Sequence, residues 1–265
     1  MSCSEILKNG CETMTTILLS GCMGKMGQVV TGCVAGRSDC TVIAGVDLNT
    51  AAFTDFPVFS SASDFGGKAD SIIDFSHPNA LAGILDYAKK TNTPAVIATT
   101  GLDANHVALI KEAAVHIPIF FSANMSIGVS LLTELARKAA RVLGNEFDIE
   151  IVEMHHNQKI DAPSGTALML ADSIAEELDT APAYEYNRPA KREARGKNEI
   201  GIHAVRGGTI TGEHEVIFAG HDELIKLTHS ARSKQIFATG AVNAAIFIKN
   251  KTPGIYTMKD LVREQ

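Results

Sequence analysis

A short apolar run that ends in closely spaced glycines constrains the start of this chain most strongly. Residues 15–20 (TTILLS) lead into Gly21, Gly24 and Gly27, and the apolar spacing from residue 28 to residue 35 is typical of a helix. Glycine has no Cβ atom, so a turn built from glycines brings the strand and the following helix close together. The segment predicts a strand, a tight turn and a helix, which is the first unit of an α/β sheet domain.

The same alternation continues to about residue 124. Four further apolar runs of strand length lie at residues 41–46, 71–75, 95–99 and 117–121. Helical patterns open at Pro78 and near Asp103, and a closing helix is expected over residues 235–248. Strands that are apolar on nearly every residue and alternate with amphipathic helices indicate a parallel sheet covered on both faces. We predict a Rossmann-type sheet domain over residues 14–124 plus 235–265.

The pattern changes after residue 124 and predicts a second domain over residues 125–234. Helices are expected at residues 126–142 and 165–178, and strands at residues 147–154, 200–205, 213–219 and 224–228. Successive strands joined by glycine-rich turns, without helices between them, predict an antiparallel or mixed sheet. The second domain is therefore of the α+β class, and residues 181–198, rich in Pro, Arg, Lys and Glu, are expected to be an exposed excursion.

Charge and cysteine content narrow the function classes. A formal net charge of -6 and a pI near 5.8 argue against a general binder of nucleic acid or anionic membranes. No apolar run approaches the ~20 residues that span a bilayer, and residues 1–13 lack a secretory signal pattern, so we interpret them as an extension before the fold. The five cysteines, an odd number without a Cys-x-x-Cys pair, predict a reducing compartment, the cytoplasm.

The glycine turn is also a candidate dinucleotide site. Backbone N–H groups at a helix start can hold a pyrophosphate, and Asp47 ends the second strand about 20 residues further on, where a carboxylate accepts from a ribose hydroxyl. The alternative, a tight turn without a ligand, does not account for Asp47. Because this carboxylate would repel a 2′-phosphate and no Arg follows it, NAD is favoured, although Lys25 could soften the preference. We expect NADH to be used at least as well as NADPH.

Two more loops lie at the predicted carboxyl ends of strands, the edge at which ligands sit in open parallel sheets. Thr99 and Gly101 belong to the first loop, and residues 121–124 (FSAN) form the second. For either loop alone, plain turn chemistry is the favoured interpretation. Together they are expected to wall the nicotinamide side of the cofactor site.

The start of the helix expected at residue 165 is a candidate anion site. Ser164 is a good N-cap, and Gly165 and Thr166 would present backbone N–H groups at the positive end of the helix. The alternative is an ordinary capped helix preceded by a solvated charged loop. The residues just before the helix favour the anion site.

Those residues are His155, His156 and Lys159, which gather donors and positive charge in an otherwise acidic chain. They suit a substrate carboxylate held at the helix start while a nearby acid supplies a proton, and either His or Lys can act as that acid. Zinc is the competing interpretation of the paired histidines. Neighbouring residues on a strand point to opposite faces, and no Cys or third His is nearby in sequence, so we expect no metal.

The run from Glu150 to Ala167 (EIVEMHHNQKIDAPSGTA) resembles the signature of the dihydrodipicolinate reductase family. The similarity extends through most of the chain from Met14, in the segments GCMGKMG, DFS, TTG, FSANMSIGV and VRGG followed by GEH. By this resemblance His155 and Lys159 form the acid/base pair, with Lys159 fitting best as proton donor. The substrate contacts it implies are His156, Ser164, Gly165 and Thr166. The cofactor contacts it implies are Gly21, Met23, Gly24, Lys25, Met26, Gly27, Asp47, Thr99, Gly101 and Asn124.

The resemblance implies an NADH- or NADPH-dependent reductase that converts the cyclic imine derived from 4-hydroxy-tetrahydrodipicolinate to tetrahydrodipicolinate, in the diaminopimelate route to lysine. It also implies a homotetramer assembled through the sheet of the second domain. Two rival functions use the same first domain: a dehydrogenase of an amino acid or semialdehyde, and a dinucleotide-sensing regulatory protein. An acylating semialdehyde enzyme needs a nucleophilic Cys, and every cysteine lies in the first 40 residues. A regulator that only binds a dinucleotide has no need of the basic residues His155, His156 and Lys159.

Overall fold

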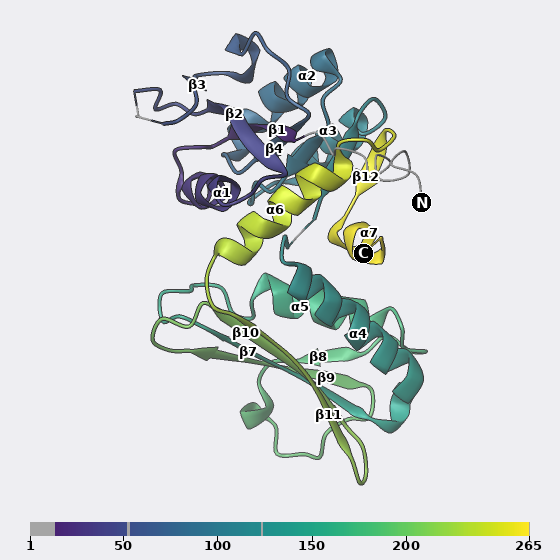
Figure 1. Ribbon diagram of the computed structural model, residues 1–265. Helices are drawn as coiled ribbons and strands as arrows, with labels where there is room; N and C mark the ends of the chain where they lie inside the picture. The colour runs from purple at the N-terminus through teal and green to yellow at the C-terminus, as the bar shows by residue number, and fades with distance from the viewer. Residues whose placement is uncertain (1–13, 52–53, 123, 265) are drawn as a thin grey trace, which may run out of the picture. The chain divides into compact units, whose positions relative to one another are not determined.

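The chain divides into two compact units. The computed structural model in Figure 1 describes residues 14–51, 54–122 and 124–264. One unit comprises the described residues up to Met125 together with those from Phe237 onward, and the other comprises Ser126–Ile236. The residues 1–13, interpreted above as an extension, lie outside the described residues. No helix in the described ranges is long and apolar enough to cross a membrane.

The first unit is built on a seven-stranded parallel sheet of order β12-β6-β5-β4-β1-β2-β3. Its strands are β1 (Thr15–Ser20), β2 (Cys40–Val46), β3 (Val58–Phe59), β4 (Ser71–Asp74), β5 (Ala95–Ile97), β6 (Pro118–Phe121) and β12 (Gly254–Tyr256). The side chains of the inner strands β1, β4, β5 and β6 are almost all buried on both faces, as their unbroken apolar runs predict, whereas the edge strands β3 and β12 are only partly buried. The Rossmann-type parallel sheet is confirmed.

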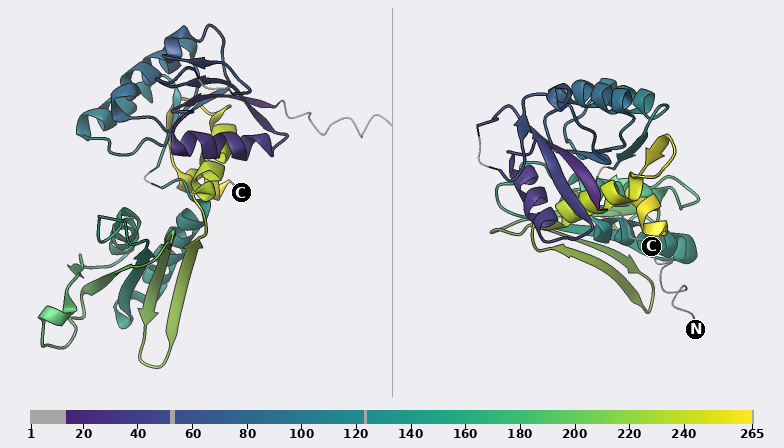
Figure 2. Two further views of the ribbon diagram at one scale, coloured as in Figure 1. Left: turned by 90° about the vertical axis from the view of Figure 1, so that its left-hand side faces the viewer. Right: turned by 45° about the horizontal axis from the view of Figure 1, so that its top comes forward.

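Helices cover both faces of this sheet. They are α1 (Lys25–Ala35), α2 (Leu81–Thr91), α3 (Ala104–Ala113), α6 (Gln235–Ile248) and α7 (Met258–Arg263), with short 3-10 turns η2 (Ala62–Asp64) and η3 (Pro78–Ala80). Figure 2 shows α2 and α3 on one face and α1 and α6 on the other. The helix expected near Asp103 begins there, because the Asp103 carboxylate accepts the His106 backbone N–H at 2.9 Å.

The second unit is a mixed five-stranded sheet of order β11-β10-β7-β9-β8. Its strands are β7 (Asp148–His155), β8 (Ala183–Glu185), β9 (Glu199–Arg206), β10 (Gly212–Ala219) and β11 (Leu224–Ala231). Strand β10 is antiparallel to β7 and β11, whereas β9 is parallel to β7 and β8. Helices α4 (Ile127–Leu143) and α5 (Gly165–Ala175) lie over one face and bury its apolar side chains, and η4 (Gly144–Glu146) and η5 (Arg188–Ala190) are 3-10 turns.

The segment expected as an exposed excursion, residues 181–198, is partly ordered into the sheet. It supplies the edge strand β8, and Arg195 ties it to β7. The Arg195 guanidinium donates to the Glu150 carboxylate at 2.9 Å, to the Asp148 carboxylate at 2.8 Å and to the Ile149 carbonyl at 3.0 Å. Composition alone does not reveal such a pairing, because it depends on a strand far away in the sequence.

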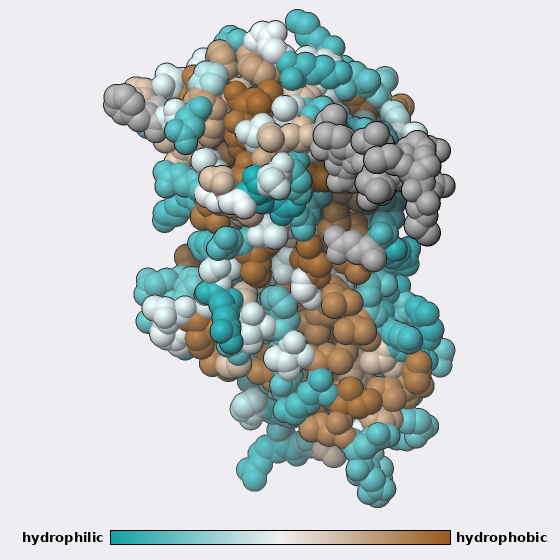
Figure 3. Space-filling view, in the orientation of Figure 1, coloured by the Kyte–Doolittle hydropathy of each residue, from teal (hydrophilic) through white to brown (hydrophobic). Residues whose placement is uncertain are grey.

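Helix α4 keeps an apolar surface that the rest of its unit does not cover. Leu131, Leu135 and Val142 on this helix are exposed. Figure 3 shows apolar surface over α4 and α5. The second unit therefore buries its own core and still presents apolar side chains outward.

Candidate active site

The glycine turn between β1 and α1 is built so tightly that only glycine fits at two positions. Gly21 has φ +73°, and a Cβ atom there would lie 2.6 Å from the Phe75 carbonyl oxygen. A Cβ on Gly27 would lie 2.2 Å from the Gly21 carbonyl oxygen. Gly24 is the N-cap of α1 and has no side chain to satisfy the first N–H groups of the helix. These groups are the ones that a pyrophosphate accepts from at this kind of turn.

Asp47, at the end of β2, is brought against this turn. One carboxylate oxygen accepts the Met23 backbone N–H at 3.0 Å, and the other accepts the Asn49 backbone N–H at 3.1 Å. Each oxygen keeps further acceptor capacity, because a carboxylate offers about four lone-pair sites. The local geometry thus fits a ribose whose hydroxyls donate to Asp47 while its phosphates lie over the turn.

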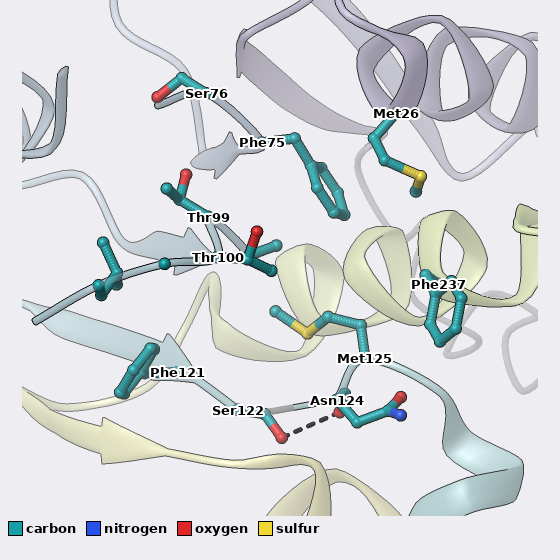
Figure 4. A pocket seen from close by; sticks show the side chains of 13 residues that line it. Met26, Phe75, Ser76, Thr99, Thr100, Phe121, Ser122, Asn124, Met125 and Phe237 are labelled. Carbon is teal, nitrogen blue, oxygen red and sulfur yellow. Dashed lines mark hydrogen bonds between the residues drawn. The ribbon is translucent and has the colours of Figure 1, made fainter. Parts of the chain in front are cut away.

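A pocket of about 630 Å³ lies at the carboxyl ends of β4, β5 and β6. It takes in four of the residues that the sequence assigns to the cofactor: Met26, Thr99, Gly101 and Asn124. Phe121 and Ser122, from the loop expected to wall the nicotinamide side, line it as well. Residues that the sequence left unassigned complete the wall: Phe75, Ser76, Ala98, Thr100, Leu102, Met125 and Phe237. Figure 4 shows the aromatic and sulfur-containing side chains around the space, with Ser122 donating to the Asn124 carbonyl at 3.0 Å. The mixture of flat apolar walls and a few polar groups suits a nicotinamide ring.

Beneath the pocket wall, Asp74 is fully buried at the end of β4. Its carboxylate accepts the Thr99 hydroxyl at 2.7 Å and the Ser76 backbone N–H at 3.3 Å. Asp74 therefore fixes two loops that line the pocket. An acidic residue that ends an apolar strand was the available signal in the sequence, but its partner lies on another loop.

In the second unit, His155 ends β7 beside a buried carboxylate. Its Nδ1 lies 2.7 Å from a carboxylate oxygen of Glu153, whose side chain is fully buried. Both Glu153 oxygens also accept from the Arg206 guanidinium at 2.7 Å. Burial raises the pKa of Glu153, but the hydrogen bonds from Arg206, His155 and the Ser164 backbone outweigh it and hold the pKa below its ordinary value. Glu153 is therefore ionised at neutral pH.

Ser164 is the N-cap of α5, and its hydroxyl accepts the Ala167 backbone N–H at 3.2 Å. Its own backbone N–H donates to Glu153 at 2.9 Å. Gly165 and Thr166 are the first two residues of the helix, and a Cβ on Gly165 would meet nothing within 4 Å. The N-terminus of α5 thus combines the positive end of the helix dipole with open space, and this combination suits a carboxylate.

The loop between β7 and α5 carries Lys159, whose Nζ lies 2.8 Å from both carboxylate oxygens of Asp161. The His156 carbonyl accepts the Lys159 backbone N–H at 3.1 Å. Arg206 also donates to the Asp161 carbonyl at 2.6 Å, so the loop is held to the Glu153 network. Within the described residues, no three His, Cys, Asp or Glu side chains are grouped as a metal site.

His214 on β10, like Glu153 and Arg206, is a residue of this network to which the sequence gave no role. Its Nε2 lies 3.0 Å from the Ser164 hydroxyl, and its ring meets the His155 ring edge to face at 5.3 Å. Burial, and then the charge of His155, lower the pKa of His214 to about 4. His214 is therefore neutral at pH 7. It is the histidine of the segment GEH that carries the family resemblance, but it lies on a strand 50 residues beyond Ser164, and only the pairing of β10 with β7 places it in this network.

Comparisons with known proteins agree with both units. The family model described as dihydrodipicolinate reductase, N-terminus, matches residues 15–125, and the one described as dihydrodipicolinate reductase, C-terminus, matches residues 128–262. A relative from Caldanaerobacter subterraneus subsp. tengcongensis, named 4-hydroxy-tetrahydrodipicolinate reductase, is 51% identical over 251 residues, covering 95% of this chain and 99% of its own. A relative of the same name from Clostridium tetani is 45% identical over 245 residues, covering 92% of this chain and 96% of its own.

Among solved structures, a dipicolinate-bound dihydrodipicolinate reductase from Paenisporosarcina sp. TG-14 superposes with a TM-score of 0.76 at 28% identity. The match covers 92% of this chain and 97% of that one. The matched residues include the glycine turn of the first unit and the β7–α5 segment of the second. With both family models matched and relatives above 40% identity over nearly the whole length, the chain belongs to the dihydrodipicolinate reductase family.

Proposed function

We propose that this chain reduces the cyclic imine derived from 4-hydroxy-tetrahydrodipicolinate to tetrahydrodipicolinate with NADH or NADPH, in the diaminopimelate route to lysine. The observation that carries the proposal is the sharing of Glu153 by a candidate acid, His155, and the anion-binding end of α5 at Ser164. The buried carboxylate of Glu153 thus contacts both the candidate proton donor, His155, and the helix start that would bind a substrate carboxylate. The shared name of the relatives supports the same activity.

The first unit fits the cofactor. The turn from Gly21 to Gly27 would hold the pyrophosphate, Asp47 the ribose, and the pocket walled by Thr99, Gly101 and Asn124 the nicotinamide. When bound, the reduced nicotinamide supplies the hydride. The remaining requirements, substrate binding, orientation and a proton, fall to side chains of the chain itself.

The second unit fits a dicarboxylate. The N–H groups that begin α5 would bind one substrate carboxylate, and His156 and Lys159 supply donors and positive charge beside them. Lys159 or His155 would deliver the proton that the reduced product needs, because both lie in the network around Glu153. A relative whose structure holds dipicolinate, a planar dicarboxylate, supports this substrate class.

The two rival functions fit less well. An acylating enzyme needs a thiolate, but burial raises the pKa of the thiols of Cys22 and Cys40, two of the three cysteines in the described part of the chain, to about 11. A regulator that only binds a dinucleotide would have no use for a lysine and an ionised carboxylate arranged around the start of α5. The reductase accounts for both sites.

We also propose a homotetramer that assembles through the face of the second sheet opposite α4 and α5. That face carries half-exposed Val152, Met154 and Ile217 and exposed Val205 and Leu224. Light scattering would give the mass, and Ile217→Lys is expected to lower it; an unchanged tetramer would exclude this face. A cytoplasmic location is proposed on the free thiols of Cys22, Cys33 and Cys40.

The experiment that tests the proposed reaction follows NADH absorbance after adding enzymatically generated 4-hydroxy-tetrahydrodipicolinate. The reductase consumes NADH only with this substrate. Consumption with an amino acid or semialdehyde instead would favour the rival dehydrogenase. If NADH binds but is not consumed with any of these substrates, the result would favour the regulator.

A further inference from the structure

We propose that Glu153 is a positioning residue that fixes the hydrogen of His155 on Nδ1 and, through its second oxygen, holds the start of α5 in place. The inference rests on the proposed function, which makes His155 a candidate acid. It assigns to a fully buried side chain a task that neither the sequence motifs nor the helix capping explain.

The Glu153 carboxylate is saturated by four short hydrogen bonds. One oxygen accepts from His155 Nδ1 at 2.7 Å and from Arg206 Nη1 at 2.7 Å. The other accepts from the Ser164 backbone N–H at 2.9 Å and from Arg206 Nη2 at 2.7 Å. The paired guanidinium compensates the buried charge and fixes the plane of the carboxylate, so Glu153 has no other orientation that satisfies its partners.

An ionised carboxylate can only accept hydrogen bonds. His155 must therefore carry a hydrogen on Nδ1, and its Nε2 becomes the atom that exchanges a proton. Two neighbours keep the ring in this orientation. His214 packs against it edge to face at 5.3 Å, and a Cβ on Gly212 would lie 3.0 Å from His155 Nε2, so glycine leaves room for that edge of the ring.

The same carboxylate controls the loop that carries Lys159. Glu153 holds the end of the loop through the Ser164 N–H, and its partner Arg206 holds the Asp161 carbonyl at 2.6 Å. At the start of the loop, the His155 carbonyl accepts the Gly207 N–H at 2.9 Å, next to Arg206. One buried ion pair therefore sets the tautomer of His155 and the path of the loop that bears Lys159.

The test replaces Glu153 by Gln, which keeps the size and removes the charge. Glu150→Gln is the matched control, because Glu150 lies on the same strand, accepts from His203 Nε2 at 2.7 Å and from Arg195 Nε at 2.9 Å, and faces away from α5. Nitrogen-15 NMR of the histidine rings reports which nitrogen carries hydrogen, and His155→Asn assigns the His155 signals. We expect the Nδ1–H form in the wild type and in Glu150→Gln, and a mixture of tautomers in Glu153→Gln.

Kinetics add a readout that a purely structural role would not move. The charged and titratable groups around His155 are Glu153 on β7, which it contacts, Arg206 on β9, which shares that carboxylate, and His214 on β10, against which it packs. Lys159 on the loop contributes to lowering the pKa of His214. Glu153→Gln removes the negative charge nearest the ring. We expect kcat to fall about 10- to 100-fold, by analogy with the loss found when the partner that orients a metal-bound His is removed. We also expect the pH–activity profile to move to lower pH, with neither change in Glu150→Gln.

The outcomes separate this inference from the proposed reaction. If the wild type shows no reductase activity but the tautomer still depends on Glu153, the reaction is wrong and the positioning role stands. If Glu153→Gln keeps the Nδ1–H form and the wild-type pH profile, the positioning role is wrong. Because removing one partner of a buried ion pair destabilises the fold, the double variant Glu153→Gln/Arg206→Met is measured in parallel. It removes both charges and is expected to show the same mixture of tautomers.

Discussion

Lys159 Nζ lies 2.8 Å from both carboxylate oxygens of Asp161, two residues further along the same loop. The Lys159 side chain is 20% exposed, so its ammonium group is held and still reachable from solvent. The Asp161 side chain is 60% exposed, and an ion pair with so exposed a partner is weak. On the proposed function, an incoming substrate carboxylate would therefore take the place of Asp161 at little cost. The pair would keep the proposed proton donor in position between turnovers.

Replacing this cation tests the catalytic assignment. We expect Lys159→Ala, and separately His155→Ala, to lower kcat by ~10²–10⁴-fold, the contribution typical of general acid–base groups. Affinity for NADH, measured by fluorescence titration, should stay close to wild type. Lys89→Ala is the control, because Lys89 also pairs with carboxylates, Asp86 at 3.3 Å and Glu112 at 3.4 Å, on the surface of α2 and α3. An equal loss of cofactor binding would show that His155 and Lys159 do not belong to the substrate site.

We expect the preference between NADH and NADPH to depend on Asp47. Its carboxylate accepts the Met23 N–H at 3.0 Å and stands where a 2′-phosphate would be repelled. We expect kcat/KM with NADH to be at least equal to that with NADPH, and Asp47→Asn to shift the ratio toward NADPH. Steady-state rates with each cofactor give the ratio. A large NADPH advantage in the wild type would contradict the assignment.

The tight turn makes Gly27 irreplaceable, and α1 offers its own control. A Cβ on Gly27 would lie 2.2 Å from the Gly21 carbonyl oxygen, whereas a Cβ on Gly32 would meet nothing within 4 Å. Gly27→Ala should distort the turn, weaken NADH binding and lower the melting temperature. Gly32→Ala should keep NADH binding and stabilise the helix by up to about 1 kcal/mol. Calorimetry and NADH titration distinguish the two, and normal NADH binding by Gly27→Ala would remove the turn from the cofactor site.

The buried His214 makes stability depend on pH. Its pKa in the folded chain is about 4, against 6.5 for an ordinary histidine. Between these values the unfolded chain binds a proton that the folded chain does not, so the free energy of unfolding falls as pH drops from 6.5 to 4. We expect His214→Gln, whose amide can also form a hydrogen bond with the Ser164 hydroxyl, to remove up to roughly 1.4 kcal/mol per pH unit of this slope.

Urea denaturation at a series of pH values measures that slope. His221→Gln is the control, since the His221 side chain is 95% exposed. An unchanged slope in His214→Gln would mean that the histidine is not held neutral by burial.

The features that the sequence predicts well are local ones. The glycine turn, the capping of α3 by Asp103 and of α5 by Ser164, and the long alternating or apolar runs each depend on residues within one or two turns of the chain. Short strands cannot be predicted in this way. Strand β3 has two residues and β12 has three, too few to show a period, and both exist because a longer strand pairs with them.

The parts of the site that the sequence did not reveal are partnerships between distant elements. Asp74 accepts from Thr99 on another loop, and Glu153 is paired with Arg206 on a neighbouring strand. In each case the residue types alone are ordinary: an acidic group in a strand is usually exposed. The role of such an acidic residue depends on its burial and on its partner. Both follow from the order of strands in the sheet, which one sequence does not determine.

The pairing of β12 with β6 has a consequence for how the molecule is made. Residues 126–236 form a continuous unit, whereas the first sheet takes its edge strand from residues 254–256, after that whole unit has been translated. On the ribosome, the later-starting unit can therefore finish folding before the earlier-starting one has received its last strand. Until then the β6 edge is open to wrong partners, a hazard of long-range strand pairing.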